Sequence, residues 1–264
     1  MNPAPIALAA GEVHVWLAFD HEFADEQVLR SFAELLEPEE IERARRARVA
    51  HLPRQRIVTR ALRRTVLSAY APGVAPADWR FATAEHGKPE LALPFAHLGI
   101  HFNVAHTSRL VAMAVAREPI GVDVEHLGER RFPLDVARRY FTASEYASLA
   151  ALPQSEQLQR FLAVWSLKES WIKATGEGLG ADLTAVSFRF ADTLRARGFA
   201  MARHGPARWR FWQGTPGDEH VLSLASRHDA EVSVFRRLPT VAWAAQTGAK
   251  PWRLVSGEEQ RPET

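Results

Sequence analysis

Two acidic side chains stand two positions apart in the segment IGVDVE at residues 120–125. The alternating apolar residues predict a strand, and residues i and i+2 of a strand point to the same face of its sheet. Asp123 and Glu125 therefore project together, while Val122 and Val124 face the core. Oxygen ligands in a chain without cysteine favour Mg²⁺, with Mn²⁺ as the alternative. The same pattern is also typical of an edge strand that turns its polar face to water.

A second polar set lies in the predicted helix Ser155–Ala174. Trp165, Glu169 and Lys173 follow one another at intervals of four residues, so they share one helical face. Beside the two carboxylates, Glu169 would add a third metal oxygen and Lys173 a cation that neutralises phosphate. The alternative is an ordinary amphipathic helix, in which such a Glu–Lys pair contributes about 0.2–0.5 kcal/mol.

Three shorter motifs carry further polar groups. A turn of sequence HGKP presents Lys88, and the end of a predicted strand presents His106 next to Thr107. Each of these segments is also consistent with an ordinary loop. The sequence TASE at 142–145 matches a helix-capping box, which gives Glu145 a structural role that competes with a catalytic one.

Charge is distributed very unevenly along a chain whose net charge is only +2. Residues 1–41 carry nine acidic side chains and one arginine, a net charge of −8. Residues 42–64 carry nine arginines and one glutamate, a net charge of +8. Such a block indicates an anionic partner, which could be a nucleic acid, a membrane surface or a small polyphosphate. Residues 42–64 contain no aromatic residue, which argues against a nucleic-acid-binding module.

The elements that must position these groups alternate short strands with clusters of helices, and the pattern restarts near residue 119. Each half runs from a strand through helices to further strands, but no internal sequence repeat is present. Strands are expected at residues 12–19, 79–82, 99–103, 110–116, 120–125, 185–190, 208–213, 221–225 and 232–235. Helices are expected at residues 25–36, 38–50, 54–70, 134–140, 143–151 and 155–174.

The composition bounds the class of protein. With 264 residues, 47% of them apolar and 24% charged, the chain is expected to fold as one large domain or two small ones. The absence of cysteine excludes disulfides, a thiolate zinc site and a cysteine nucleophile, and it fits a cytoplasmic protein. The first residues lack the basic region of a signal peptide, and no uncharged apolar run reaches the roughly 18 residues of a membrane helix.

The chain resembles the 4′-phosphopantetheinyl transferases. Within that family it resembles the larger, monomeric type, which primes carrier proteins of peptide and polyketide synthases. The resemblance spans roughly residues 54–180. Its most specific part is the pair formed by G-[IV]-D-[IV]-E and W-x-x-K-E-[SA]-x-x-K at this separation. The motifs that carry it, in chain order, are HGKP at 86–89, FNVAH at 102–106, GVDVE at 121–125, FTASE at 141–145 and WSLKESWIK at 165–173.

This resemblance implies an α+β fold of two similar subdomains related by a pseudo-twofold, each a small antiparallel-rich sheet packed with helices. Residues 1–118 would form the N-terminal subdomain, on the side of the coenzyme A adenylate and 3′-phosphate. Residues 119–243 would form the C-terminal subdomain with the metal-binding carboxylates and the catalytic helix. Residues 244–264 would form a polar tail.

The resemblance also implies the reaction. The 4′-phosphopantetheine arm of coenzyme A would pass to a serine hydroxyl of an acidic apo carrier protein, and adenosine 3′,5′-bisphosphate would be released. The enzyme is expected to be a cytoplasmic monomer that uses Mg²⁺ and binds neither nucleic acid nor membrane.

The resemblance assigns roles to individual residues. Asp123, Glu125 and Glu169 would hold the metal ion. Either Glu169 or a metal-bound water next to it would be the base, with Lys173 and Glu145 as further catalytic residues. The expected contacts to coenzyme A are Lys88, His106, Thr107, Lys173 and two arginines of the basic segment, Arg56 first and Arg48 next.

The chain departs from the family pattern at one position. Ala105 stands where the family commonly has a serine before the histidine, so that hydroxyl contact is either lost or supplied by Thr107 or Ser108. A Mg²⁺-dependent phosphohydrolase, with water as nucleophile on the same carboxylates, is the alternative enzyme. The family motifs are the only sequence feature that separates the two.

Overall fold

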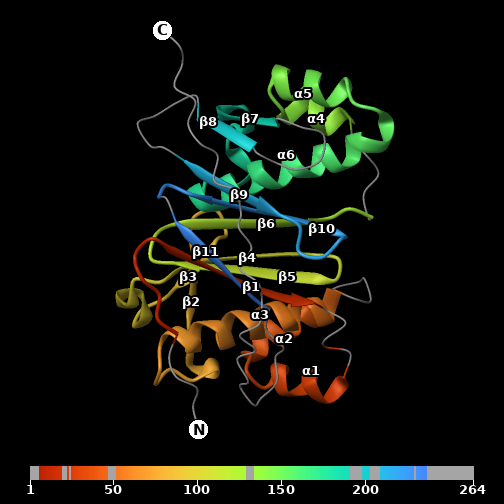
Figure 1. The fold of residues 1–264 in the computed structure, drawn as a ribbon. Helices are drawn as coiled ribbons and strands as arrows, with labels where there is room; N and C mark the ends of the chain where they lie inside the picture. Colours follow the sequence, from red (N-terminus) through yellow and green to blue (C-terminus); the bar gives the residue numbers. More distant parts are fainter. Residues whose placement is uncertain are drawn as a thin grey trace.

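The computed structural model describes residues 6–19, 23, 25–46, 52–128, 134–190, 198–202, 209–228 and 230–236. Two central sheets lie against each other, and helices cover both outer faces (Figure 1). Helix α3 (Leu52–Tyr70) lies on the first sheet and α6 (Gln154–Thr175) on the second. This arrangement confirms the predicted α+β class. Within the described part of the chain, no helix combines the length and the apolar character needed to cross a bilayer.

The first sheet has the strand order β11-β1-β5-β4. Strand β1 pairs antiparallel with β5 and parallel with β11, and β5 pairs antiparallel with β4. The helices that precede α3 begin at capping residues. The Asp25 carboxylate accepts the Gln27 N–H at the start of α1, and Glu37 and Glu40 form a capping box at the start of α2. The bounds are β1 Glu12–Phe19, β4 His101–Thr107, β5 Leu110–Ala116, β11 Glu231–Arg236, α1 Glu26–Ala33 and α2 Pro38–Arg45.

The second sheet has the strand order β6-β10-β9, with both pairings antiparallel. Two hairpin-like pairs, β2–β3 and β7–β8, lie outside the central sheets. The two central sheets meet where β4 runs beside β6. There the Asn103 side chain accepts a hydrogen bond from the Val122 N–H at 2.8 Å. The bounds are β2 Phe81–Thr83, β3 Pro89–Leu91, β6 Ile120–His126, β7 Val186–Phe190, β8 Gly198–Ala202, β9 Arg210–Gly214, β10 His220–Ser226, α4 Leu134–Tyr140 and α5 Ala143–Ala150.

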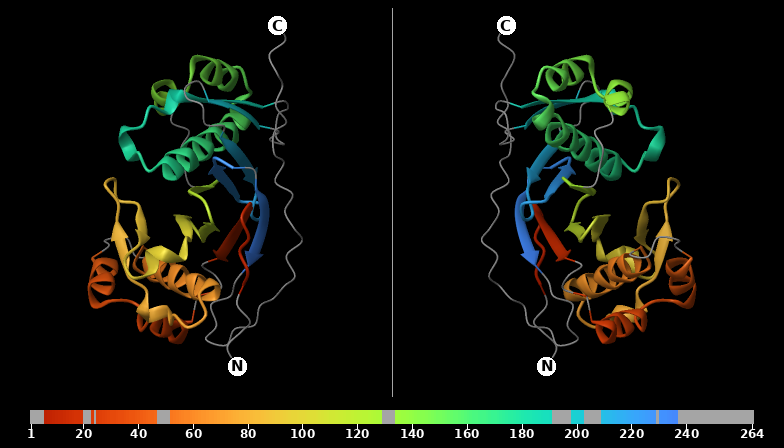
Figure 2. Two further views of the ribbon diagram at one scale, coloured as in Figure 1. Left: turned by 90° about the vertical axis from the view of Figure 1, so that its left-hand side faces the viewer. Right: turned by 90° about the vertical axis from the view of Figure 1, so that its right-hand side faces the viewer.

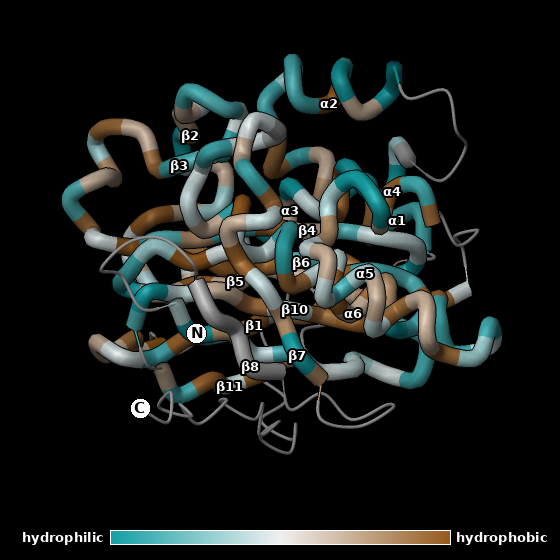
Figure 3. Tube along the Cα trace, turned by 90° about the horizontal axis from the view of Figure 1, so that it is seen from above, coloured by the Kyte–Doolittle hydropathy of each residue, from teal (hydrophilic) through white to brown (hydrophobic). Residues whose placement is uncertain are grey.

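Apolar side chains form three cores that alternate with these layers. One core lies between the first sheet and the helices of the N-terminal half, and another surrounds α6. The third fills the space between the two sheets, where Val13 and Val15 of β1 pack with Val122 and Val124 of β6. Hydrophobic residues accordingly follow the central strands in Figure 3, and α6 lies above the second sheet in both views of Figure 2.

Helix α6 crosses β6 at very short range because residue 121 is glycine. A Cβ atom at Gly121 would lie 1.9 Å from the carbonyl oxygen of Ser170 and 2.5 Å from the backbone nitrogen of Ala174. Any other side chain would therefore push the helix away from the strand. This contact fixes the distance between the two elements that carry the candidate site residues.

Most predicted elements are confirmed, and the differences are local. The helix expected at 25–36 ends at Ala33, and the one expected to reach Ala50 ends at Arg45. Strands β3 and β8 were not predicted, because three- and five-residue strands carry little periodicity. Strand β11, which the boundary at residue 119 places in the second subdomain, pairs with β1 of the first sheet. The tail 244–264 lies outside the described residues, and the pseudo-twofold relation stays a prediction.

Replacement of Gly121 by alanine is expected to lower the free energy of unfolding by about 2 kcal/mol or more. Adding a side chain to a packed site typically costs 1–3 kcal/mol, and here the obstructing atoms belong to backbone that cannot rotate away. Chemical denaturation measures the change. Gly180→Ala is the matched control, because a Cβ there would meet no atom within 4 Å. Equal stabilities of the two variants would contradict the close crossing.

Candidate active site

The expected helical face of α6 is present in the structure. Between residues 161 and 174, Trp165, Glu169 and Lys173 are half-buried, and every other residue is buried. The three side chains therefore form a stripe that is open at the surface of an otherwise enclosed helix. Trp165 stacks on Phe161 and packs against Tyr140, so it belongs to an aromatic cluster beside the polar pair.

The strand carboxylates lie beneath this stripe. The Lys173 ammonium contacts Asp123 Oδ1 at 2.6 Å, which joins α6 to β6. Burial lowers the pKa of Lys173, but the negative charges of Asp123, Glu169 and Glu125 outweigh it and leave that pKa above its ordinary value. All three predicted carboxylates thus act on one ammonium group. Asp123 and Glu125 are buried, so the alternative of a polar face open to water is wrong.

The chemistry of these side chains suits a hard divalent cation. The donors are carboxylate oxygens, and Asp123 Oδ2 is buried without a hydrogen-bond partner. Within the described residues, no group of three His, Asp or Glu side chains has the arrangement of a metal site, and Lys173 lies against Asp123. Binding of an ion by all three carboxylates would therefore require side-chain rearrangement.

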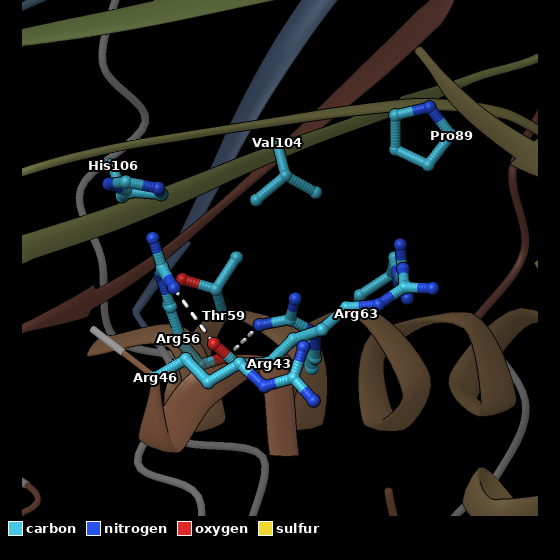
Figure 4. Close-up of a pocket in the computed structure, with 9 residues that line it drawn as sticks. Arg43, Arg46, Arg56, Thr59, Arg63, Pro89, Val104 and His106 are labelled. Atoms are coloured by element: carbon cyan, nitrogen blue, oxygen red, sulfur yellow. Dashed lines mark hydrogen bonds between the residues drawn. The ribbon is translucent and has the colours of Figure 1, made fainter. Parts of the chain in front are cut away.

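A cavity of about 550 Å³ opens between α2, α3 and β4. Arginines from the two helices face Pro89, Val104 and His106 across it (Figure 4). Arg56 lies among them and donates a hydrogen bond to the Arg43 carbonyl oxygen at 2.9 Å. We call this space the arginine cavity. Its lining residues are Arg43, Arg46, Arg56, Thr59, Arg60, Arg63, Pro89, Val104 and His106.

The arginines of this cavity fall into two groups. Glu40 pairs with Arg60 and Arg63 of the first group at 3.6 and 3.0 Å, and also with the fully buried Arg64 next to the cavity at 2.7 Å. Burial would raise the pKa of Glu40, but its hydrogen bond and charge contact with Arg64 hold that pKa below its ordinary value.

The second group has no such neutralising partner. Within the described residues, Arg43, Arg46 and Arg56 are paired with no carboxylate. Their positive charges therefore face the cavity uncompensated, which favours binding of an anion there.

His106 lies between the arginine cavity and the carboxylates. Desolvation is the main cause that lowers the pKa of His106. The pKa is lowered further by the positive charges of Lys173, Arg56 and Arg60, and the negative charge of Asp123 opposes this with a smaller effect. The imidazole is thus within electrostatic reach of both sites.

Two other predicted coenzyme contacts have different surroundings. Lys88 donates hydrogen bonds to the carbonyl oxygens of Lys173 and Ile120, at 2.6 and 3.4 Å. Burial lowers the pKa of Lys88. Thr107 is half-buried at the end of β4, and its carbonyl oxygen accepts a hydrogen bond from the Gln55 side chain. Arg48 lies outside the described residues.

Glu145 has the contacts of a structural residue. It completes the predicted capping box with Thr142, and its other oxygen accepts the Phe188 N–H at 2.8 Å. It also pairs with Lys168 at 2.9 Å, and both side chains are fully buried. The Lys168 ammonium completes its hydrogen bonds with the carbonyl oxygens of Leu183 and Val186.

Sequence reasoning left the individual arginines of the cavity unresolved. Arg56, Arg60 and Arg63 are spaced at i, i+4 and i+7, which places them on one face of α3. That spacing is a signal for a basic helical face. The addition of Arg43 and Arg46 depends on how α2 packs on α3, which no local pattern reveals.

A carboxylate–lysine junction and an arginine-lined cavity together have the charges that suit a ligand carrying phosphate groups. The model of the 4′-phosphopantetheinyl transferase superfamily matches residues 119–225. The chain is 31% identical to the 4′-phosphopantetheinyl transferase HetI of Nostoc sp., over 85% of this chain and 91% of that protein. It is 33% identical to the 4′-phosphopantetheinyl transferase Sfp of Bacillus subtilis, over 74% of this chain and 84% of that protein. The chain belongs to the 4′-phosphopantetheinyl transferase family.

Among solved structures, a holo-[acyl-carrier-protein] synthase of Thermotoga maritima matches 40% of this chain and 61% of its own, at 20% identity and a TM-score of 0.33. A match at this level supports no inference about the site.

Anion binding in the arginine cavity should be visible in the titration of His106. Its pKa in the free protein is expected below the ordinary value of 6.5, because desolvation and nearby cations disfavour the protonated form. Adenosine 3′,5′-bisphosphate should raise this pKa, because the bound phosphates stabilise the imidazolium. NMR titration of the His106 ring measures both states. Adenosine, which lacks phosphate, is the control, and an equal response to both ligands would contradict the assignment.

Proposed function

We propose that this enzyme transfers the 4′-phosphopantetheine arm of coenzyme A to a serine hydroxyl of an apo carrier protein and releases adenosine 3′,5′-bisphosphate. The observation that carries the proposal is the Lys173–Asp123 contact, which joins α6 to β6 beside the arginine cavity. It puts a cation and carboxylates next to a space that suits a nucleotide phosphate. Family membership supplies the group that is transferred.

Coenzyme A would bind with its nucleotide end in the arginine cavity. Arg43 and Arg56 are suited to the 3′-phosphate because they come from different helices and converge in the cavity. His106 is suited to the diphosphate because it lines the cavity and is also within the charge influence of Lys173 and Asp123. Residues 1–118 would then supply the nucleotide site, and residues 119–243 the reacting groups. Contacts from Lys88, Thr107 and Arg48 stay predictions.

Asp123, Glu125 and Glu169 would hold Mg²⁺, which when bound would neutralise charge on the diphosphate. Lys173 would leave Asp123 and place its ammonium on the phosphate oxygens, where charge builds up as the diphosphate bond breaks. Glu169 would accept the serine proton, directly or through a water molecule, as the serine oxygen bonds to phosphorus. The adenosine 3′,5′-bisphosphate group departs with the bridging oxygen.

Glu145 would support this chemistry from a distance. Its carboxylate is fully buried and occupied by Lys168 and by backbone N–H groups, so it has no oxygen free for a substrate. We therefore assign it to holding α5 and β7 against α6. The carrier protein is expected to be acidic, because the exposed arginines would steer its approach. A monomeric enzyme stays a prediction.

Incubation with coenzyme A, Mg²⁺ and an apo carrier protein should add about 340 Da to the carrier, the mass of the transferred arm. Mass spectrometry of the carrier measures this change. Glu169→Gln keeps the side-chain shape but removes the charge, so it should slow the transfer by at least about a hundredfold. Glu177→Gln, an exposed position beyond the end of α6, is the control and should transfer normally. Normal transfer by Glu169→Gln would contradict its role, and no mass gain with the unaltered enzyme would contradict the function.

Arg56→Ala should raise the KM for coenzyme A and narrow the preference for coenzyme A over its 3′-dephospho form. A charge-assisted contact to phosphate contributes about 1.5–3 kcal/mol, which corresponds to roughly 10- to 150-fold. Steady-state kinetics with both donors measure the preference. Arg45→Ala is the control, because Arg45 is exposed and pairs with Glu42 of the same helix, α2. If both variants keep the unaltered preference, Arg56 does not contact the 3′-phosphate.

A further inference from the structure

The turn between β2 and β3 reaches from the N-terminal half to the end of α6, as Figure 2 shows. Lys88 at this turn places its ammonium 2.6 Å from the carbonyl oxygen of Lys173 and 3.4 Å from that of Ile120. One side chain thus contacts the backbone of both elements of the catalytic junction. A cation at this position is favourable because the last carbonyl groups of a helix carry partial negative charge.

A second contact holds the same turn against the chain that follows α6. A Cβ atom at Gly178 would lie 2.8 Å from the Cβ of His86, so the two segments touch at a position that only glycine allows. The turn itself is closed by a hydrogen bond from the Ala84 N–H to the Lys88 carbonyl oxygen at 2.9 Å. Gly87 adopts a φ of +85° within it. The position of the Lys88 side chain is therefore set by a tight, docked turn.

Lysine is rare in this protein, which has four lysines and 29 arginines. The three lysines in the described part of the chain all contact oxygen atoms inside the fold. Lys88 binds two carbonyl oxygens, Lys168 binds two carbonyl oxygens and Glu145, and Lys173 binds Asp123. An ammonium directs its three protons from one point, whereas a guanidinium group directs its donors in the plane of a fork. The Lys88 ammonium is thus used as a hydrogen-bond donor to the fold, as the ammonium groups of Lys168 and Lys173 are.

Lys88 and its neighbour Pro89 stand where two cavities adjoin. Pro89 lines both the arginine cavity and a second cavity of about 530 Å³, and Lys88 lines only the second, together with Ala174 and Thr175 at the end of α6. The ammonium is already occupied by two carbonyl oxygens. A movement of the turn when a nucleotide contacts Pro89 would therefore be transmitted through Lys88 to the backbone of Lys173.

We propose that Lys88 is a positioning residue that couples the nucleotide cavity to the catalytic lysine by holding the last turn of α6 against the β2–β3 turn. This inference rests on the proposed function, because it assigns Lys173 to the chemical step. A positioning residue and a phosphate ligand affect different kinetic constants. A ligand would contribute mainly to the binding of coenzyme A, whereas a positioning residue contributes mainly to kcat through Lys173.

Steady-state and binding measurements on Lys88→Met test the proposal, since methionine keeps the apolar stem and removes the ammonium. We expect kcat to fall at least tenfold, and the KM for coenzyme A and the Kd for adenosine 3′,5′-bisphosphate to change less than threefold. Lys88→Arg keeps the charge and should restore kcat only in part, because the longer side chain places its N–H donors differently from an ammonium. Combining Lys88→Met with Lys173→Ala should lower kcat no further than Lys173→Ala alone. Glu85→Gln, an exposed change in the same turn, should leave all constants unaltered.

The contrary results are equally defined. A rise of tenfold or more in both KM and Kd with unaltered kcat would make Lys88 a phosphate ligand, and unaltered constants would remove it from the mechanism. Independent effects in the double variant would also overturn the coupling. If Lys88→Met does not fold, Gly178→Ala tests the same docked turn, and it should lower kcat without weakening nucleotide binding. The unaltered enzyme is measured in the same assay. If it does not transfer the arm, the proposed function is contradicted; if it does, the variants test the role of Lys88 by itself.

Discussion

The close crossing of α6 over β6 at Gly121 is the constraint on which the rest of the site depends. With the helix backbone in contact with the strand, residues 123 and 173 come within the length of one ion pair. The same crossing buries Asp123 and Glu125 beneath a helix that leaves only a narrow stripe open. The carboxylates are thus held in a poorly solvated place, where their charges act strongly on any cation that enters.

The charged side chains of the site are gathered by sign, with carboxylates around Lys173 and arginines around the cavity. The carboxylates all act on the Lys173 ammonium, and Glu40 neutralises Arg63 and Arg64 of α3. The remaining arginines line an open cavity together with His106. A substrate that carries phosphate groups along its length would satisfy both regions at once. This arrangement explains the abrupt change from acidic to basic residues near position 42, because the acidic segment supplies Glu40 to the basic one.

The sequence predicted well the helices and strands that carry a sustained apolar pattern, and the site residues that lie within one such element. The shared faces of β6 and α6 followed from spacing alone: Lys173 contacts Asp123, and the charges of Glu169 and Glu125 act on the same ammonium group. The arginine cavity could not be predicted, because it forms where α2 packs against α3 and β4. The contacts of Lys88 with backbone carbonyl oxygens could not be predicted either, since they depend on a turn that docks against a residue 85 positions away in the chain.

Binding of Mn²⁺, followed by electron paramagnetic resonance in the presence of adenosine 3′,5′-bisphosphate, tests most directly whether β6 and α6 form one metal–phosphate site. The account predicts that the unaltered protein binds the ion and that Asp123→Ala weakens binding by more than about tenfold. Asp123→Ala should remain folded, because the half-buried Lys173 ammonium that loses its partner still lies within the charge influence of Glu169 and Glu125. Asp218→Ala, an exposed change, should bind the ion as the unaltered protein does. Equal Mn²⁺ affinity in the folded Asp123→Ala variant would contradict the account.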